Sequence, residues 1–142
     1  MNGAVPKAPL AGGCQCGTVR YEITSDPVRL YVCHCRECQK QSSSAFGISL
    51  IVPRAGFRVT AGSTKSWTRP TDSGGRLRCV FCPACGSRLW HESDPAATTI
   101  SVKGGSLDTP LDLGTVPHLW TVRTLAGVII PEGAVQYPKE PK

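Results

Sequence analysis

The chain has 142 residues, a formal net charge of +6 at pH 7, 15 glycines and 12 prolines, with few aromatic residues. No stretch approaches the roughly 20 apolar residues that span a bilayer, so no membrane segment is expected. The start of the chain lacks the basic and apolar pattern of a signal peptide, which favours the cytoplasm. This length predicts a single domain over residues 1–142, with a core at about 10–130.

The pattern of apolar residues favours strands. Residues 1–10 contain two prolines and little periodicity, and predict a loose arm. Alternating or continuous apolar segments then predict strands at 18–24, 29–33, 45–52, 57–61, 63–68, 76–81, 87–92 and 98–103. Two shorter apolar runs, 117–121 and 125–130, follow.

The other segments predict one or two helical turns and several loops. Residues 36–44 contain helix formers and few breakers, and Gly62 between two strands suggests a hairpin. Glycine and proline predict loops at 68–75 and 104–114, and residues 137–142 predict a frayed tail. The fold class is therefore mostly β, with small twisted antiparallel sheets and at most a short helix.

Seven of the eight cysteines fall into three tight clusters. Their sequences are GGCQCG, CHCREC and FCPACG, which contain Cys14, Cys16, Cys33, Cys35, Cys38, Cys82 and Cys85. In a reducing cytosol such clusters are typical of metal ligands rather than disulfides. The sequence therefore predicts two zinc ions per chain, with the sheets organised around them.

A glycine directly follows two of these cysteine pairs. Gly17 follows Cys16 and Gly86 follows Cys85, and glycine adopts the left-handed backbone that a tight turn around a metal needs. We therefore assign one closed, structural zinc site to four thiolates, those of Cys14, Cys16, Cys82 and Cys85.

The remaining triple, Cys33, Cys35 and Cys38, lacks such a glycine and leads into the predicted helical turn. Three thiolates leave the fourth zinc position for water or a substrate thiol, which is the layout of a reactive site. Alternatively the chain closes this site itself, through His34 or, more plausibly, through Cys79. A [4Fe–4S] cluster is a further alternative, although the spacing is not a familiar ferredoxin pattern.

The ordered motifs resemble the glutathione-dependent formaldehyde-activating enzyme family, which shares a domain with centromere protein V. The matching segments are GGCQCGTVRYE, CHCRECQKQSSSAF, FCPACGSRL, VKGGSLDTP and HLW. The resemblance implies a small β fold with a structural zinc on the four thiolates and a catalytic zinc on the triple. It also implies a carbon–sulfur lyase that joins glutathione, as co-substrate, to formaldehyde or a small aldehyde. One departure is Ser43, which takes the family's usual glycine position and is expected to crowd or re-tune the pocket.

Glutathione carries two carboxylates, so its pocket should offer cations. Arg36 and Lys40 lie close to the triple and share one face of a helix by their i, i+4 spacing, so they are the predicted ligand contacts. Weaker candidates are Arg88, Lys103 and Arg123. Candidate proton donors for the adduct are His34, Ser42 and His118.

Two further functions compete with the lyase. One is a non-catalytic carrier that binds glutathione or another thiol at the open zinc. The other is a closed two-zinc module for protein or nucleic acid, with Cys79 as the eighth ligand. The scattered Lys and Arg residues show no basic stripe with aromatic residues, so small thiols and aldehydes are the expected partners rather than nucleic acid. The oligomeric state is left open.

Overall fold

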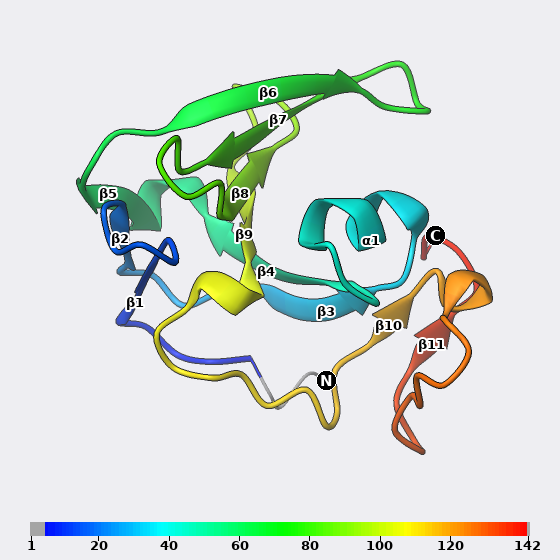
Figure 1. Cartoon of the computed structure of the whole chain (residues 1–142). Helices are drawn as coiled ribbons and strands as arrows, with labels where there is room; N and C mark the ends of the chain where they lie inside the picture. The colour runs from blue at the N-terminus through cyan, green and yellow to red at the C-terminus, as the bar shows by residue number, and fades with distance from the viewer. Residues whose placement is uncertain (1–4, 142) are drawn as a thin grey trace.

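The computed structural model describes residues 5–141 and contains two β-sheets and one short helix in that range (Figure 1). The predicted fold class, mostly β around two cysteine clusters, is confirmed. That the chain is one domain stays a prediction. No helix within residues 5–141 has the length and apolar character needed to cross a membrane.

The larger sheet has eight strands and carries most of the core. In spatial order they are β11 (Gln136–Tyr137), β10 (His118–Leu119), β3 (Arg29–Cys33), β4 (Gly47–Pro53), β9 (Thr99–Lys103), β8 (Arg88–Glu92), β7 (Arg76–Phe81) and β6 (Lys65–Pro70). From β3 to β6 all neighbours are antiparallel. The short β10 lies parallel to both β3 and β11, so the expectation of antiparallel sheets fails at this edge.

The smaller sheet has three strands, β1 (Leu10–Gly13), β2 (Arg20–Ile23) and β5 (Phe57–Ala61). The predicted hairpin around Gly62 is wrong, because β5 pairs with β2 while β6 pairs with β7. Gly62 has φ +80°, and a Cβ there would lie 2.4 Å from the carbonyl oxygen of Thr18. The chain therefore uses this glycine to cross from one sheet to the other.

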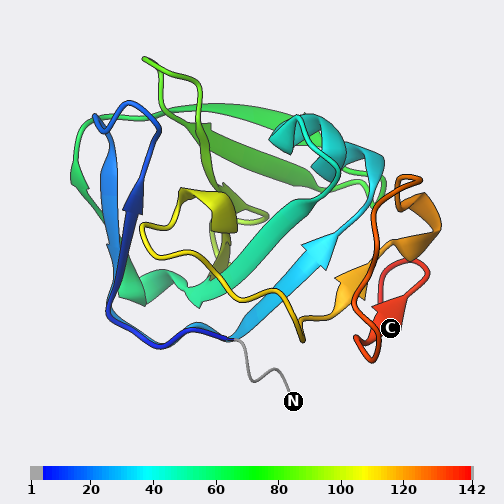
Figure 2. The same cartoon turned by 60° about the horizontal axis from the view of Figure 1, so that its bottom comes forward.

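The core lies between the two sheets. Tyr21 and Ile23 of β2 are buried, as are Leu30 of β3 and Leu50 of β4. The connection from 104 to 117 runs along the gap between the sheets (Figure 2). It begins with a 3-10 helix, η2 (Gly104–Ser106), whose Ser106 hydroxyl lies 2.6 Å from the Tyr21 hydroxyl. This bond joins the connection to the smaller sheet.

Two further 3-10 helices connect strands. They are η1 (Arg54–Gly56), between β4 and β5, and η3 (Thr121–Arg123), after β10.

The single α-helix of the described residues, α1 (Arg36–Ser42), packs on the end of β4. A Cβ on Gly47 would lie 3.1 Å from the Cβ of Cys38, so this glycine permits the close approach. The helix ends at Ser43, whose φ of 50° is the left-handed conformation in which glycine is favoured. The structure thus gives a backbone reason for the family's usual glycine at this position.

Residues 8–10 and 137–140 are more ordered than the sequence predicts. Residues 1–4 of the predicted N-terminal arm lie outside the described residues. Beyond them, the Ala8 amide donates to Asp26 at 2.8 Å and Leu10 begins β1. At the other end, Tyr137 lies in β11 and the Trp120 indole donates to Glu140 at 2.8 Å. The predicted fraying is therefore wrong for 137–140.

Candidate metal centres and the adjoining cavities

Four sulfur atoms from two distant turns meet in one cluster. The Sγ atoms of Cys14, Cys16, Cys82 and Cys85 all lie within 4.8 Å of one another. The Cys14–Cys16 and Cys16–Cys82 sulfur distances are 3.5 and 3.8 Å. A tetrahedral ion with zinc–sulfur bonds of about 2.3 Å has sulfur–sulfur edges of about 3.8 Å. The donor set therefore fits a closed zinc site.

The backbone around this cluster is shaped to hold thiolates. Gly17 and Gly86, each after the second cysteine of its pair, have a φ of +82°, as the predicted turns require. The Val19 amide donates to the Cys14 sulfur at 3.2 Å, and the Ala84 amide points at the Cys82 sulfur at 3.4 Å. Such N–H groups offset the charge of bound sulfur.

Ser87 joins the two halves of the four-cysteine cluster. Its hydroxyl accepts from the Gln15 amide at 2.9 Å and lies 3.3 Å from the Cys85 sulfur. Hydrogen bonds from the Ser87 hydroxyl and from backbone amides lower the pKa of Cys85 to about 5. Because one pair follows β1 and the other follows β7, a metal here would tie the smaller sheet to the larger one.

The second cluster comes from one short segment. Cys33 ends β3, Cys35 is the N-cap of α1, and Cys38 lies in the first turn of that helix. Their sulfur atoms lie within 4.8 Å of one another, and the Cys38 amide points at the Cys35 sulfur at 3.4 Å. Among residues 5–141, no fourth His, Cys, Asp or Glu ligand atom belongs to this group. The donor set therefore fits a zinc with three protein ligands.

Crowded thiols need a counter-charge. Hydrogen bonds from the Cys33 and Cys38 thiols lower the pKa of Cys35 to about 2, while the hydrogen bond with Cys35 raises the pKa of Cys33. Without a bound cation the three sulfurs thus share protons instead of ionising together. A divalent ion would allow all three to be thiolates.

Neither predicted alternative ligand joins this cluster. Cys79 is buried in β7, where its Sγ lies 3.7 Å from the Leu77 carbonyl oxygen. The Nε2 atom of His34 lies 2.8 Å from Nδ1 of His118, and both rings are buried. Burial lowers the pKa of each histidine, so the pair is neutral. Cys79 is thus a core thiol, and the two histidines join β10 to the residue that directly follows β3.

A cavity of about 400 Å³ opens beside the three-cysteine cluster. We call it the cysteine cavity; its lining includes Tyr31, Cys33, Cys35, Glu37, Cys38, Lys40, Gln41, Ser49, Trp67, Arg69, Leu77, Arg88, His91, Ser101, Lys103 and Glu140. The β6–β7 ribbon extends over α1 in Figure 1 and supplies Trp67, Arg69 and Leu77. The cavity is therefore built by strands far apart in the sequence.

The cysteine cavity is rich in unpaired cations. No carboxylate of the described chain lies within 4.0 Å of the charged nitrogens of its four cations, Lys40, Arg69, Arg88 and Lys103. Elsewhere Arg20 pairs with Asp108, and Arg54 pairs with Glu92. Its two acidic side chains are Glu37 and Glu140. The cavity thus suits a ligand with carboxylates and one amine.

Some of the ligand contacts predicted from the sequence line the cysteine cavity and others do not. Lys40 lines the cysteine cavity, as do Arg88 and Lys103, the weaker candidates. Arg36 lies instead in a separate hollow beside Gln39 and Ser43. Ser43 does not line the cysteine cavity, so the expected crowding of the pocket by its side chain is not seen.

The remaining candidates, among them the three predicted proton donors, also lie outside the lining of the cysteine cavity. Arg123 and the donors His34 and His118 do not line it. Ser42 donates to the Cys38 carbonyl at 2.7 Å and lines a neighbouring cavity.

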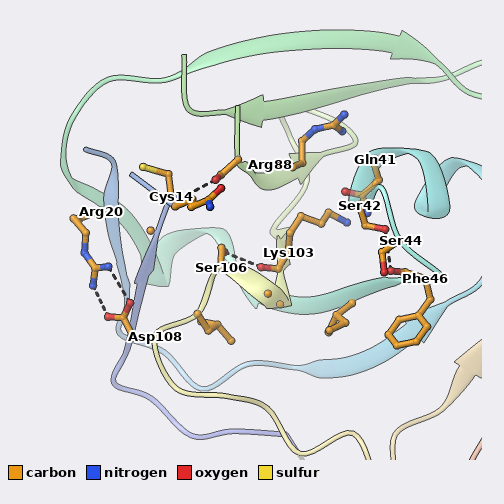
Figure 3. A pocket seen from close by; sticks show the side chains of 17 residues that line it. Cys14, Arg20, Gln41, Ser42, Ser44, Phe46, Arg88, Lys103, Ser106 and Asp108 are labelled. Carbon is orange, nitrogen blue, oxygen red and sulfur yellow. Dashed lines mark hydrogen bonds and ion pairs between the residues drawn. The ribbon is translucent and has the colours of Figure 1, made fainter. Parts of the chain in front are cut away.

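That neighbouring cavity has about 720 Å³, and we call it the loop cavity (Figure 3). Its lining consists of Gly13, Cys14, Gln15, Arg20, Gln41, Ser42, Ser44, Phe46, Ile48, Ser87, Arg88, Lys103, Gly104, Gly105, Ser106, Leu107 and Asp108. It extends from Cys14 of the four-cysteine cluster to Ser42 at the C-terminal end of α1.

Sequence reasoning missed several cavity residues. Ser49, His91 and Ser101 line the cysteine cavity from the central strands β4, β8 and β9. Only Ser49 gave a signal in the sequence, as a polar side chain inside the largely apolar strand β4. Trp67 was also missed, and its side chain is 55% exposed at the cavity.

A family model and a curated relative both match this chain, and both carry the same family description. The model of the family described as "Glutathione-dependent formaldehyde-activating enzyme" matches residues 9–123. A Penicillium rubens protein named "Putative glutathione-dependent formaldehyde-activating enzyme" is 34% identical over 95 residues, which are 63% of this chain. The matched part is 49% of that relative, so the chain spans about half the length of the curated relative it matches.

A solved structure shares the fold. A crystal structure of a Rhodobacter sphaeroides protein superposes with a TM-score of 0.52 and 19% sequence identity. The match covers 89% of this chain and 98% of the other. At this identity the similarity shows the fold alone.

Proposed function

This chain belongs to the glutathione-dependent formaldehyde-activating enzyme family, and on that premise we propose that it is a zinc-dependent carbon–sulfur lyase. The proposed substrates are glutathione, or a similar thiol, and formaldehyde or a small aldehyde. The reaction adds a thiol to a carbonyl: the carbon–sulfur bond forms, the carbonyl π bond breaks, and the thiol proton ends on oxygen. The product is S-(hydroxymethyl)glutathione, and the reverse reaction releases the aldehyde.

One observation supports this proposal most. The three sulfurs of Cys33, Cys35 and Cys38 face a cavity and have no fourth protein ligand among the described residues. Zinc held there would supply Lewis acidity that keeps an incoming thiol deprotonated at neutral pH. The four-cysteine cluster would hold a second, structural zinc.

The chain's own residues would bind and orient the tripeptide. Lys40 and Arg69 lie at the cavity and are free to meet a carboxylate, while Glu37 and Glu140 are available to the substrate amine. Trp67 and Leu77 provide an apolar wall that limits the water around the reacting carbon. Because the chemistry needs reduced thiols, the cytoplasm is part of the proposal.

Nuclear magnetic resonance exchange spectroscopy tests the proposal directly. Glutathione and formaldehyde interconvert with their adduct, and we expect the zinc-loaded protein to raise this exchange rate catalytically. The Cys35→Ser variant should lose the acceleration, whereas Arg29→Met, at an exposed position lining neither cavity, should retain it. Equal acceleration by wild type and Cys35→Ser would contradict the proposal, and binding without acceleration would indicate a thiol carrier instead.

A further inference from the structure

The cysteine cavity and the loop cavity adjoin through a shared wall. Three residues, Gln41, Arg88 and Lys103, line both of them. In Figure 3 the side chains of Arg88 and Lys103 point toward the side where Gln41 lies. The two cavities are therefore adjacent, and Gln41, Arg88 and Lys103 lie at the boundary between them.

Lys103 has the environment of an anion-binding cation. Its Nζ donates to the Ser49 hydroxyl at 3.3 Å and to the Ser101 hydroxyl at 3.1 Å. These bonds use two of its three protons and place the amine at the junction of the cavities. Burial lowers the pKa of Lys103, the sulfurs of Cys38 and Cys33 act in the opposite direction, and an anionic ligand would stabilise the charged amine further.

Arg88 is oriented by a neutral histidine. Its Nη1 donates to Nε2 of His91 at 2.8 Å, and a guanidinium can only donate. Burial lowers the pKa of His91 to about 2, so the ring accepts this bond without repelling the guanidinium. His91 uses one N–H group and leaves the others of Arg88 available to a ligand.

Arg88 and Lys103 differ from Arg20, another cation that lines the loop cavity. Arg20 also lines the loop cavity, but it already forms an ion pair with Asp108 (Figure 3). Neither Arg88 nor Lys103 has a carboxylate within 4.0 Å in the described part of the chain. Cations kept in a cavity without a partner usually meet their counter-ion in a ligand.

We propose that Arg88 and Lys103 together form a carboxylate-binding site at the junction of the two cavities. The inference takes the ligand class from the proposed function: a thiol peptide whose sulfur reaches the three-cysteine cluster while one carboxylate lies between Arg88 and Lys103. The rest of such a peptide extends into the loop cavity. The site selects carboxylate-bearing thiols over small neutral thiols, which would leave both cations unpaired.

The test uses a ligand that lacks the thiol, so its binding does not depend on a metal–sulfur bond. γ-Glutamyl-2-aminobutyryl-glycine has a methyl group where glutathione has its thiol, and its affinity for the metal-loaded protein is measured by calorimetry. We expect Arg88→Met and Lys103→Met each to weaken binding by about tenfold or more, because each removes a charge-assisted hydrogen bond. Arg29→Met should bind as wild type does. The diethyl ester, in which both carboxylates are neutral, should bind wild type about tenfold more weakly and the Met variants with little further loss.

Other results would overturn the site. They are no binding of the analogue, equal losses in Arg29→Met and the two cavity variants, or an ester that binds as tightly as the acid. If a Met variant does not fold, Arg88→Gln and Lys103→Gln remove the charge but keep a polar side chain, and they should weaken binding of the acid while leaving binding of the ester nearly unchanged. Glutathione that leaves the metal spectrum unchanged, while the analogue binds through Arg88 and Lys103, would refute the proposed function and leave the carboxylate site standing.

Discussion

The two cysteine clusters use the same ligand atom in opposite structural settings. The four-cysteine cluster draws its sulfurs from turns 66 residues apart, Cys16 and Cys82, and joins two sheets. The three-cysteine cluster draws all its sulfurs from one short segment, from the end of β3 to the first turn of α1, and faces a cavity. A site that connects distant elements contributes stability, whereas a site on one local segment can leave a position for chemistry.

Removing one sulfur from each cluster tests most directly whether only the four-cysteine cluster is needed for folding. Cys82→Ser should unfold the chain, because structural zinc contributes about 10–16 kcal/mol in small zinc domains and whole domains have only about 5–15 kcal/mol of stability. Cys35→Ser should stay folded, because serine can replace the N-cap that Cys35 provides to α1. Circular dichroism and metal analysis, with two zinc per wild-type chain and one in Cys35→Ser, check both outcomes. If both variants unfold, the two clusters do not differ in their contribution to stability.

The rates at which a chelator removes metal should also differ between the two clusters. With a chromogenic chelator we expect two phases of metal release, each of one equivalent, with the fast phase from the three-cysteine cluster. An incomplete shell facing a cavity gives the chelator a position to attack. The Cys35→Ser variant should lack the fast phase. A single phase of two equivalents in wild type would contradict the distinction.

Variants of the buried histidine pair and of Cys79 test whether the three-cysteine cluster lacks a fourth protein ligand. His118→Leu removes the partner of the His34 Nε2 atom and should cost about 1–3 kcal/mol in the free energy of unfolding, measured with urea. The variant should still bind two metal ions, as should Cys79→Ala, which changes one of the two residues, His34 and Cys79, that the sequence offers as a fourth ligand. Loss of one metal in Cys79→Ala would show that the chain closes the second site itself.

The smallest expected effect concerns the end of α1. Ser43→Gly should raise the free energy of unfolding by about 0.5–1 kcal/mol, because Ser43 has a φ of 50° and glycine tolerates this conformation. Ser44→Gly, one residue further, has no such strain to relieve and should not stabilise. Affinity for glutathione should change little in Ser43→Gly, since Ser43 does not line the cysteine cavity. Thermal unfolding and calorimetry measure the two quantities.

The sequence was most informative about the metal centres. Thiols one to three residues apart, such as Cys14 and Cys16, must lie close together whatever the fold. The strands around them were predictable where apolar residues form short runs, as at 29–33 and 76–81, and the structure places β3 and β7 there. Local spacing therefore carried both the fold class and the two clusters.

The cysteine cavity and the loop cavity could not be predicted, because they depend on the pairing of strands far apart in the sequence, which local patterns do not contain. Gly62 between two strands looks like a hairpin turn, yet β5 pairs with β2 and β6 with β7. Lys103 and Ser49 are opposite one another in the β4–β9 register, 54 residues apart, so their contact appears only in the folded sheet. Strand order, not strand content, was the missing information.

The central claim is that the three-cysteine cluster leaves a coordination position for an external thiol. Cobalt replaces zinc in cysteine sites and reports its ligands through its visible spectrum, so glutathione is titrated into the cobalt-loaded protein. We expect a saturable spectral change with one equivalent of glutathione, which is absent in Cys35→Ser. A spectrum that does not respond to glutathione in the wild-type protein would contradict an open coordination position at the three-cysteine cluster.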